Sequence, residues 1–271
     1  MKFRMKAIWS VYMAAVFLFS ASVFYREDIQ NVFEEKNTKA YLAIIIDDFG
    51  YGGEGTDEML ALDADITAAV MPFSEKSAQE VEKIKNSGKE MIVHMPMESL
   101  TGKKSWVGDR GVFINMTDEE IYKVVEEALE IVDGAVGLNN HMGSAIMENE
   151  RCLKAVLDIV KEKNLIFIDS ATTPKSLGKK LSDEKEVCFL KRDVFLDSTD
   201  DINIVRERIR QAEEVALKKG TAVAIGHVGP EGGKITAKAI GELKSELEEK
   251  GIELVTVSEM KQIYESRKNN N

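Results

Sequence analysis

Five side chains in this sequence could together hold a divalent metal ion and move protons beside it. Asp47 and Asp48 directly follow the apolar letters AIII, and the three histidines of the chain, His94, His141 and His227, each end another apolar run. Imidazole and carboxylate groups suit zinc-like or manganese-like ions with coordination positions open to water. Such an ion lowers the pKa of its water to about 7 and polarises a carbonyl group. The set therefore suffices to hydrolyse an amide or an ester, with one carboxylate as base and one imidazole as acid.

The two adjacent carboxylates alone would not establish a site. Aspartate before glycine is ordinary turn chemistry, and glycines follow at once at positions 50, 52, 53 and 55. The three histidines favour a site over a turn, because the carboxyl ends of parallel strands meet on one face of an α/β sheet or barrel. The glycines would then turn the chain close to a substrate.

The rest of the chain predicts the elements that position these groups. Short apolar runs alternate with amphipathic stretches, which indicates a parallel α/β fold. The expected strands are residues 42–46, 66–71, 91–93, 135–138, 165–168, 187–190, 221–225 and 252–255. The expected helices are residues 74–87, 117–132, 149–163, 201–219 and 235–250, the second beginning with a T-x-x-E capping box at Thr117 and Glu120. Seven or eight strands favour a barrel, closed or partly open, and no strand is followed by G-x-G-x-x-G spacing.

Composition argues against several classes of function. The formal net charge of −11 argues against nonspecific binding of nucleic acid. Cys152 and Cys188 lie far apart without C-x-x-C spacing, so we expect neither a disulfide framework nor a thiolate zinc site. Both cysteines are predicted to be small core residues. A serine hydrolase is not indicated, because G-x-S-x-G is absent.

The N-terminus has the features of an export signal or a membrane anchor. Lys2, Arg4 and Lys6 precede residues 7–25, which carry no charge. This stretch is long enough to span a bilayer, and its basic flank predicts an N-terminus inside and a folded domain outside the cytoplasmic membrane. The letters SAS at 20–22 form only a weak cleavage site, so an anchor is favoured over a cleaved signal peptide.

The same patterns give the domain organisation. We expect a signal anchor or signal peptide at residues 1–25, a polar linker at 26–40, the barrel at 41–262 and a polar tail at 263–271. One connection within the barrel, residues 99–115, is long and contains Trp106, and loops of this length are usually functional. The indole of Trp106 would either stack on a sugar or plug the loop onto the barrel.

The sequence resembles the divergent polysaccharide deacetylases, relatives of the NodB-type carbohydrate deacetylases. Six ordered blocks carry the resemblance across residues 41–260: IIIDDFGYGG (44–53), VHMPME (93–98), GLNNHMGSAIM (137–147), FIDSATTPKS (167–176), RDVFLD (192–197) and IGHVGPEGG (225–233). The resemblance implies a distorted, NodB-like (β/α) barrel of seven or eight strands. It also implies metal-assisted removal of acetyl groups from an extracellular or cell-envelope glycan, with zinc as the leading ion and manganese, cobalt or nickel as alternatives.

Roles for single residues follow from the resemblance. Asp47 would be the catalytic base, His227 the general acid and Asp48 a metal ligand. The better-studied deacetylases take both histidine ligands from one H-x-x-x-H motif, which this chain lacks. His94 and His141, from neighbouring strands, are the expected substitutes. The departure leaves open a barrel that binds or scaffolds glycans without turnover, and hydrolysis of non-sugar acetyl compounds at the same site.

Seven further side chains are expected to bind substrate or to support the site. They are Glu98, Trp106, Asn140, Ser144, Asp169, Arg192 and Asp197. Arg192 could orient a carboxylate. Two of these residues could instead have a purely structural role: Glu98 could close a loop, and Asn140 could cap the following helix. An N-cap is the favoured interpretation of Asp169, and Asp197 precedes Ser198 and Thr199, which are also cap residues.

Overall fold

The computed structural model describes residues 39–199, 201–230 and 232–269. Its strands are β1 (Ala40–Phe49), β2 (Thr67–Val70), β3 (Glu90–Met97), β4 (Gly137–Met142), β5 (Ile166–Asp169), β6 (Cys188–Lys191), β7 (Val194–Phe195), β8 (Thr221–His227) and β9 (Ile252–Val255). Its helices are α2 (Thr56–Leu60), α3 (Ser77–Ser87), α4 (Asp118–Ile131), α5 (Ser144–Met147), α6 (Glu150–Glu162), α7 (Gly178–Lys185), α8 (Ile202–Lys219), α9 (Gly233–Glu249) and α10 (Val257–Asn269), with a 3-10 turn, η1, at Lys104–Trp106.

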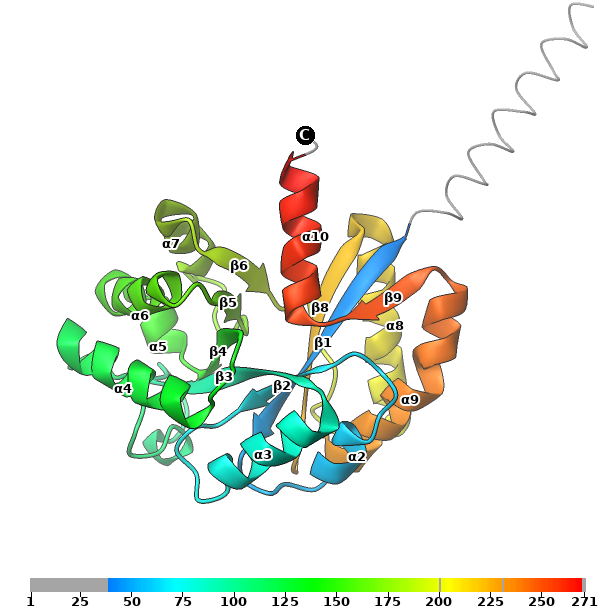
Figure 1. Ribbon diagram of the computed structural model, residues 1–271, viewed down its shortest axis with the longest axis horizontal. Helices are drawn as coiled ribbons and strands as arrows, with labels where there is room; N and C mark the ends of the chain where they lie inside the picture. Colours follow the sequence, from blue (N-terminus) through cyan, green and yellow to red (C-terminus); the bar gives the residue numbers. More distant parts are fainter. Residues whose placement is uncertain (1–38, 200, 231, 270–271) are drawn as a thin grey trace, which may run out of the picture. The chain divides into compact units, whose positions relative to one another are not determined.

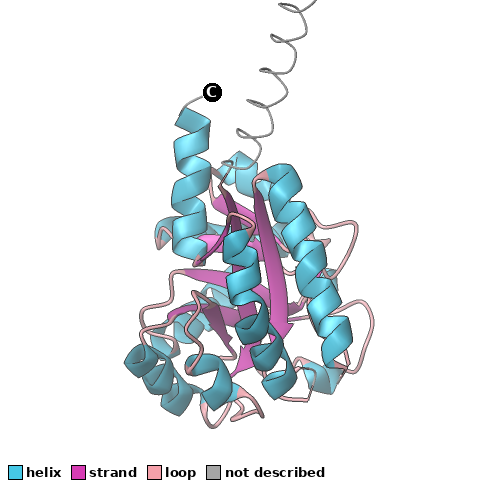
Figure 2. Cartoon of the chain, turned by 90° about the vertical axis from the view of Figure 1, so that its right-hand side faces the viewer, coloured by secondary structure: helices cyan, strands magenta, loops and turns pink. Residues whose placement is uncertain are grey.

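The strands form one curled parallel sheet surrounded by helices (Figures 1 and 2). Their order is β6-β5-β4-β3-β2-β1-β8-β7, and β9 pairs with the first residues of β1. Within the described residues no ladder joins β6 to β7, so the barrel is open between them. The eight expected strands are all present, which confirms the distorted (β/α) barrel, and the two-residue β7 is added to them.

Alternate residues of the strands enter two different apolar clusters. In β1, Leu42, Ile44 and Ile46 pack against the surrounding helices, whereas Ala43 and Ile45 face the inside of the curled sheet. The inner cluster also contains one or two residues from each of β2, β3, β5, β6 and β8: Ala69, Ile92, Ile166, Ile168, Leu190, Val223 and Ile225. Every second residue of a strand faces inward, so this alternation continues to the carboxyl ends of the strands. We call that end the mouth of the barrel, and the last inward-facing side chains lie there.

Helix α10 covers the end of the barrel at which the strands begin (Figure 1). Val257 lies in the inner cluster, and its N–H donates to Thr67 Oγ1 at 3.2 Å, at the start of β2. The N–H of Ser258 donates to Glu90 Oε1 at 3.2 Å, at the start of β3. The helix continues through residues 263–269, most of the expected polar tail. With this end covered, the carboxyl ends of the strands form the other end, where a site is expected.

Three of the five predicted helices begin at the expected cap residue, whereas α3 and α9 begin at Ser77 and Gly233, three residues later and two residues earlier than expected. In the capping box of α4, Thr117 Oγ1 accepts a hydrogen bond from Glu120 N and Glu120 Oε2 accepts one from Thr117 N, at 3.2 and 2.8 Å. Asn149 and Asp201 cap α6 and α8 through their side-chain oxygens. Each of these bonds satisfies an N–H that would otherwise lack an intrahelical partner.

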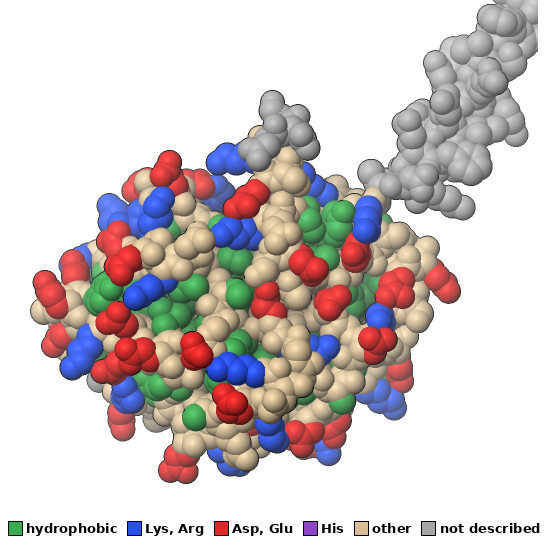
Figure 3. Space-filling view, viewed as in Figure 1, with side chains coloured by type: hydrophobic (Ala, Val, Ile, Leu, Met, Phe, Trp, Pro, Cys, Tyr) green, Lys and Arg blue, Asp and Glu red, His purple; other side chains and the backbone are tan. Residues whose placement is uncertain are grey.

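The two cysteines are free thiols in apolar surroundings, as predicted: Cys152 is buried in the outer cluster and Cys188 packs against the inner one. Acidic and basic side chains are interspersed over the surface in Figure 3. Ion pairs between such exposed side chains contribute little, so the fold depends mainly on the two apolar clusters. Within the described range no helix has the length and apolar character to cross a membrane. The expected anchor, residues 1–25, lies outside that range.

Candidate metal centre

Asp47 and Asp48 reach the same space although they are consecutive residues of β1. Consecutive strand residues normally point to opposite faces of a sheet. Here the register against β2 shifts between Ile46 and Phe49, and Asp48 adopts a positive φ of 68°. The bulge re-aims the side chain, so Asp47 Oδ2 and Asp48 Oδ1 lie 3.6 and 3.4 Å from His94 Nε2. A non-glycine residue held in this conformation is strained, and such strain collects at functional sites.

Helix α3 and the turn before it hold the loop that follows Asp48. Gly50 has a φ of 110°, and a Cβ at this position would lie 2.6 Å from the carbonyl oxygen of Met71, so only glycine fits. Its N–H donates to Glu80 Oε2 at 2.5 Å, and its carbonyl oxygen accepts a hydrogen bond from Ser74 Oγ. These bonds fix the turn that sets the direction of Asp48.

His94 on β3 and His141 on β4 complete a three-residue cluster with Asp48. His141 Nδ1 lies 3.1 Å from His94 Nε2 and 3.3 Å from Asp48 Oδ1. The three ligand atoms all lie within 4.8 Å of one another. Three protein ligands of this kind are typical of catalytic zinc sites, which leave further positions open.

The separations in this cluster fit a small divalent ion. Ligand bonds of roughly 2.0–2.1 Å in a tetrahedral arrangement place neighbouring ligand atoms about 3.3 Å apart. The three separations are 3.1, 3.3 and 3.4 Å. Asp48 Oδ1 is buried and has no hydrogen-bond partner among the described residues. A buried carboxylate oxygen in that state is costly unless a cation neutralises it, so the residues present fit the ion.

A second hydrogen bond fixes the orientation of each imidazole in the cluster. Asn139, which is fully buried, accepts from His94 Nδ1 at 2.7 Å and donates to Asp47 Oδ1 at 2.8 Å. His141 Nε2 donates to the backbone carbonyl of Trp106 at 3.2 Å. Histidines that bind metals commonly use their second nitrogen in this way. The remaining nitrogen of each ring is thereby directed at Asp48 Oδ1.

The two aspartates differ in their pKa. Burial raises the pKa of Asp47, although the charges of His94 and His227 oppose the shift. Burial also acts to raise the pKa of Asp48, but the imidazoles of His141 and His94, 3.3 and 3.4 Å from its Oδ1, outweigh burial and hold the pKa far below its usual value. A carboxylate that stays ionised suits a ligand, whereas a raised pKa suits a base that must take up a proton.

His227 lies on β8, on the other side of β1 from β2 and β3, and is held by Asp197. Its Nδ1 donates to Asp197 Oδ1 at 2.7 Å, and its backbone N–H donates to Asp197 Oδ2 at 2.9 Å. Thr236 Oγ1 donates to the same Oδ2 at 2.6 Å. Burial lowers the pKa of His227, but the bond to Asp197 and the charge of Asp47 raise it to about 9. At neutral pH the imidazole therefore carries a second proton, as a general acid requires. Asp201 caps α8, so Asp197 has no capping role.

The N-cap interpretation of Asp169 is wrong. Helix α7 begins only at Gly178, with Leu177 as its N-cap residue. Asp169 instead accepts hydrogen bonds from Ala171 N at 2.7 Å and Ser176 Oγ at 2.6 Å. The chain turns sharply at Ala171, which has a φ of 56°, and the carboxylate is used to hold this turn.

Arg192 contacts carbonyl oxygens in place of the expected carboxylate. It donates from Nε to Ser170 O at 2.7 Å and from Nη2 to Ala171 O at 3.2 Å, and no described carboxylate forms an ion pair with it. Its guanidinium lies over the Phe195 ring at 5.1 Å, and that ring lies 4.7 Å from the ring of His227. Arg192 therefore packs on Phe195, which in turn packs on the imidazole of His227.

The long loop at residues 99–115 is held at both ends and passes beside the cluster. Glu98 Oε2 accepts from Ile114 N at 2.8 Å, which confirms its loop-closing role, and Ser144 Oγ accepts from Leu100 N at 2.9 Å. Trp106 contributes its carbonyl to His141, while the residue is 56% exposed. The indole is therefore available to a ligand.

Asn139 belongs to the site but was not among the residues expected from the sequence. Asn140 was expected instead, but its side chain accepts from Ser170 N at 3.0 Å. Nor does Asn140 cap a helix, because Gly143 is the N-cap residue of α5. Strand alternation could have identified Asn139, since residues two apart share a face and Asn139 precedes His141 by two.

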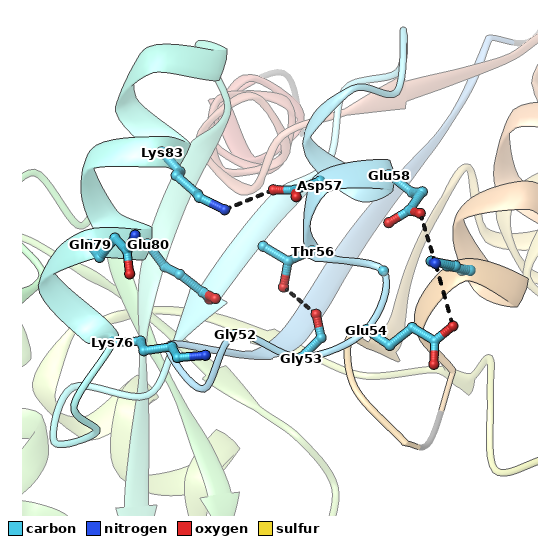
Figure 4. Close-up of a pocket in the computed structure, with 12 residues that line it drawn as sticks. Gly52, Gly53, Glu54, Thr56, Asp57, Glu58, Lys76, Gln79, Glu80 and Lys83 are labelled. Atoms are coloured by element: carbon cyan, nitrogen blue, oxygen red, sulfur yellow. Dashed lines mark hydrogen bonds and ion pairs between the residues drawn. The ribbon is translucent and has the colours of Figure 1, made fainter.

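A polar cavity of about 380 Å³ lies at the glycine-rich loop and contains none of the cluster residues (Figure 4). It is lined by residues 52–58 with Lys76, Gln79, Glu80, Lys83 and Lys234. Lys83 pairs with Asp57 at 2.9 Å and Lys234 with Glu58 at 3.3 Å. The lining mixes both signs of charge and carries no imidazole, so we assign the chemistry to the cluster and not to this cavity.

The comparison with known families agrees with this geometry. The family model of the divergent polysaccharide deacetylases matches residues 44–261. The chain belongs to the divergent polysaccharide deacetylase family. Membership places it among the hydrolases that deacetylate carbohydrates, and confirms the resemblance carried by the six sequence blocks.

Two relatives share about a third of their aligned residues with this member of the family. An uncharacterized protein of Haemophilus influenzae is 33% identical over 189 residues, which cover 70% of this chain and 67% of the relative. The uncharacterized protein YibQ of Escherichia coli is 34% identical over 189 residues, which cover 70% of this chain and 59% of YibQ. The aligned part is thus about three-fifths of YibQ.

Solved structures share the fold at low sequence identity. Protein ATU2773 of Agrobacterium tumefaciens has a TM-score of 0.75 at 17% identity, covering 82% of this chain and 89% of that one. The Xyl-CE4 domain of a multidomain xylanase from the hindgut metagenome of Trinervitermes trinervoides has a TM-score of 0.52 at 13% identity, covering 83% and 91%. The Bc1960 peptidoglycan N-acetylglucosamine deacetylase has a TM-score of 0.51 at 14% identity, covering 83% and 89%. These similarities support the NodB-like barrel.

Proposed function

We propose that this chain is a metal-dependent hydrolase that removes acetyl groups from a cell-envelope or extracellular polysaccharide. The observation that carries the proposal is the convergence of Asp48, His94 and His141 within 4.8 Å, beside Asp47, in a member of a deacetylase family. A catalytically inactive barrel would have no need to keep Asp48 in a strained backbone conformation with a buried oxygen that lies between two imidazoles and has no hydrogen-bond partner among the described residues.

Asp48, His94 and His141 would hold the ion. We propose zinc, because two imidazoles and one carboxylate match its catalytic sites, and manganese, cobalt and nickel are the alternatives to test. When bound, the ion polarises the acetyl carbonyl and lowers the pKa of water.

Asp47 and His227 divide the proton transfers between them. Asp47 Oδ1 is held by Asn139, which leaves Oδ2 to accept a proton from the attacking water. The water oxygen forms a bond to the acetyl carbon, and the bond from that carbon to the sugar nitrogen or oxygen breaks. His227 donates its proton to that leaving atom, and Asp197 holds the imidazole in place. The products are acetate and a free amine or hydroxyl.

Two exposed aromatic residues border the site and are proposed to contact the polysaccharide. Trp106 is 56% exposed and Tyr51 is 54% exposed. Tyr51 follows Asp48 by three residues, and partial burial and the charge of Asp48 raise its pKa. The backbone carbonyl of Trp106 contacts His141. Flat aromatic faces beside a polar centre suit the apolar faces of sugar rings.

We propose that residues 1–25 anchor the protein to the outer face of the cytoplasmic membrane, or direct its secretion. The support is the basic flank and the uncharged stretch in the sequence. A location outside the cytoplasm would bring the barrel to the proposed glycan. Protease treatment of intact spheroplasts tests this, because digestion of the barrel requires it to lie outside the membrane.

The activity test is acetate release from acetylated chito-oligosaccharides and peptidoglycan fragments by the zinc-loaded full-length chain. Asp47→Asn and His227→Gln should each lower kcat by about 10²- to 10⁴-fold, because each removes a proton-transfer group. Glycan binding without acetate release in the metal-loaded protein would instead favour the glycan-binding or scaffolding barrel. Release from non-sugar acetyl esters alone would contradict the polysaccharide substrate.

A further inference from the structure

Asn139 joins the proposed base to a proposed metal ligand through one amide group. Its Oδ1 lies 2.7 Å from His94 Nδ1 and its Nδ2 lies 2.8 Å from Asp47 Oδ1. The ladder between β3 and β4 pairs Asn139 with His94 in register. Of the residues described, Asn139 alone donates a hydrogen bond to the side chain of Asp47, and it is fully buried.

Only one orientation of this amide satisfies both neighbours. A carboxylate has no proton to donate, so the NH2 end of Asn139 must face Asp47. The oxygen then faces His94, which must donate from Nδ1, so the neutral imidazole that a metal ion requires has its lone pair at Nε2. That nitrogen is the one directed at Asp48 Oδ1, 3.4 Å away. In the reversed amide, the Asn139 oxygen would face Asp47 Oδ1, so two acceptors would meet. The Asn139 NH2 would then face His94 Nδ1, which would move the proton of the imidazole to Nε2, where it would block the metal.

We propose that Asn139 is a positioning residue that sets the tautomer of His94 and the rotamer of Asp47 at the same time. The Asp47 half of this inference rests on the proposed deacetylase function, whereas the His94 half concerns metal binding alone. Holding Oδ1 leaves Asp47 Oδ2 directed toward the cluster, 3.6 Å from His94 Nε2. The buried amide of Asn139 thus aligns the base, Asp47, with the ion that would activate the attacking water.

Two substitutions separate the halves of this role. Aspartate has the shape of asparagine and can still accept from His94, but it has no N–H for Asp47. Leucine has a similar volume and offers neither an acceptor nor a donor. A residue that only filled space would give the same result with both.

The experiment measures zinc affinity, by competition with a chromophoric chelator, and the cobalt absorption spectrum in the full-length chain. Asn139→Leu should lower zinc affinity by about 10- to 100-fold and alter the cobalt spectrum, because His94 loses the partner that orients it. Asn139→Asp should keep zinc affinity within about threefold of the wild type or raise it, since a carboxylate also orients a metal-bound histidine. Its acetate release should nevertheless fall by about 10²-fold, because Asp47 loses its donor and gains a repelling charge.

Asn149→Asp makes the same chemical change at the N-cap of α6 and should leave zinc affinity and acetate release unchanged. Wild-type zinc affinity in folded Asn139→Leu would overturn the His94 half. If that variant does not fold, a loss of zinc affinity beyond tenfold in Asn139→Asp would do so. Wild-type acetate release in Asn139→Asp would overturn the Asp47 half. A wild type that binds zinc but deacetylates nothing would refute the proposed function and the Asp47 half, while the zinc measurements would still decide the His94 half.

Discussion

Asp47 and His227 occupy paired positions on the adjacent parallel strands β1 and β8. The proposed base and the proposed acid therefore start from neighbouring backbone positions at the mouth of the barrel. The charge of each group acts on the pKa of the other, lowering that of Asp47 against burial and raising that of His227. Each group thus favours the protonation state in which the other begins the reaction.

Asp197→Asn should shift the alkaline limit of activity. The hydrogen bond to Asp197 helps to raise the pKa of His227 to about 9, so the acid remains protonated up to that pH. Without the carboxylate the pKa falls, and activity should be lost at lower pH. The measurement is the pH dependence of kcat for acetate release. An alkaline limb at the same pH in both proteins would mean that His227 is not the acid.

His227 should also make stability depend on pH. Its pKa of about 9 in the folded chain exceeds the ordinary value of 6.5. The protonated group therefore stabilises the fold below pH 6.5, and this contribution is lost as the pH rises through about 9. The free energy of unfolding in urea should fall by up to about 3 kcal/mol over this range. The fall should be smaller in His227→Gln, and an equal fall in both proteins would assign it to other groups.

Gly50→Ala should weaken zinc binding without touching a ligand. The added Cβ would lie 2.6 Å from Met71 O at a φ of 110°, so the loop after Asp48 must move. We expect a loss of about 1–3 kcal/mol in unfolding free energy together with reduced zinc affinity. Gly251→Ala is the matched control, because Gly251 has a φ of 80° and open space around it. That variant should lose stability only, and equal loss of zinc affinity in the two would refute the link.

Trp106→Ala should raise KM for polysaccharide while leaving zinc affinity unchanged. Trp106 orients His141 through its backbone carbonyl, which alanine retains, whereas its exposed indole is the part proposed to meet the sugar. The expected rise in KM is about 3- to 10-fold, in line with one aromatic contact. Zinc titration and acetate-release kinetics on one preparation test both statements. A parallel loss of zinc affinity would show that the indole holds the loop instead.

The fold was largely predictable because the signals are local. Apolar runs such as AIII before Asp47 and capping residues such as Thr117 reveal their elements without knowledge of the rest of the chain. The elements that escaped carry weak local signals. Strand β7 has two residues, and α2, α5 and α7 have five, four and eight. The first two turns of α10 present only Val257, Met260 and Ile263 to the core.

Most members of the candidate site could be proposed from the sequence, but their connections could not. The histidines stand out at strand ends, yet the bulge that turns Asp48 beside Asp47 depends on the pairing of β1 with β2. The bond between Asp197 and His227 likewise exists only once β7 and β8 lie side by side. Asn139 could have been chosen over Asn140 by strand alternation alone, whereas its link to His94 required the register of β3 and β4.

The proposed metal centre is tested by zinc titration of the full-length chain in an isothermal calorimeter, with Asp48→Asn and His141→Ala measured alongside. We expect one ion per wild-type chain. In each variant the affinity should fall by more than the roughly 10- to 100-fold that outer partners of a metal site contribute. A wild type that binds no zinc, manganese, cobalt or nickel, or variants that bind as tightly as the wild type, would contradict it.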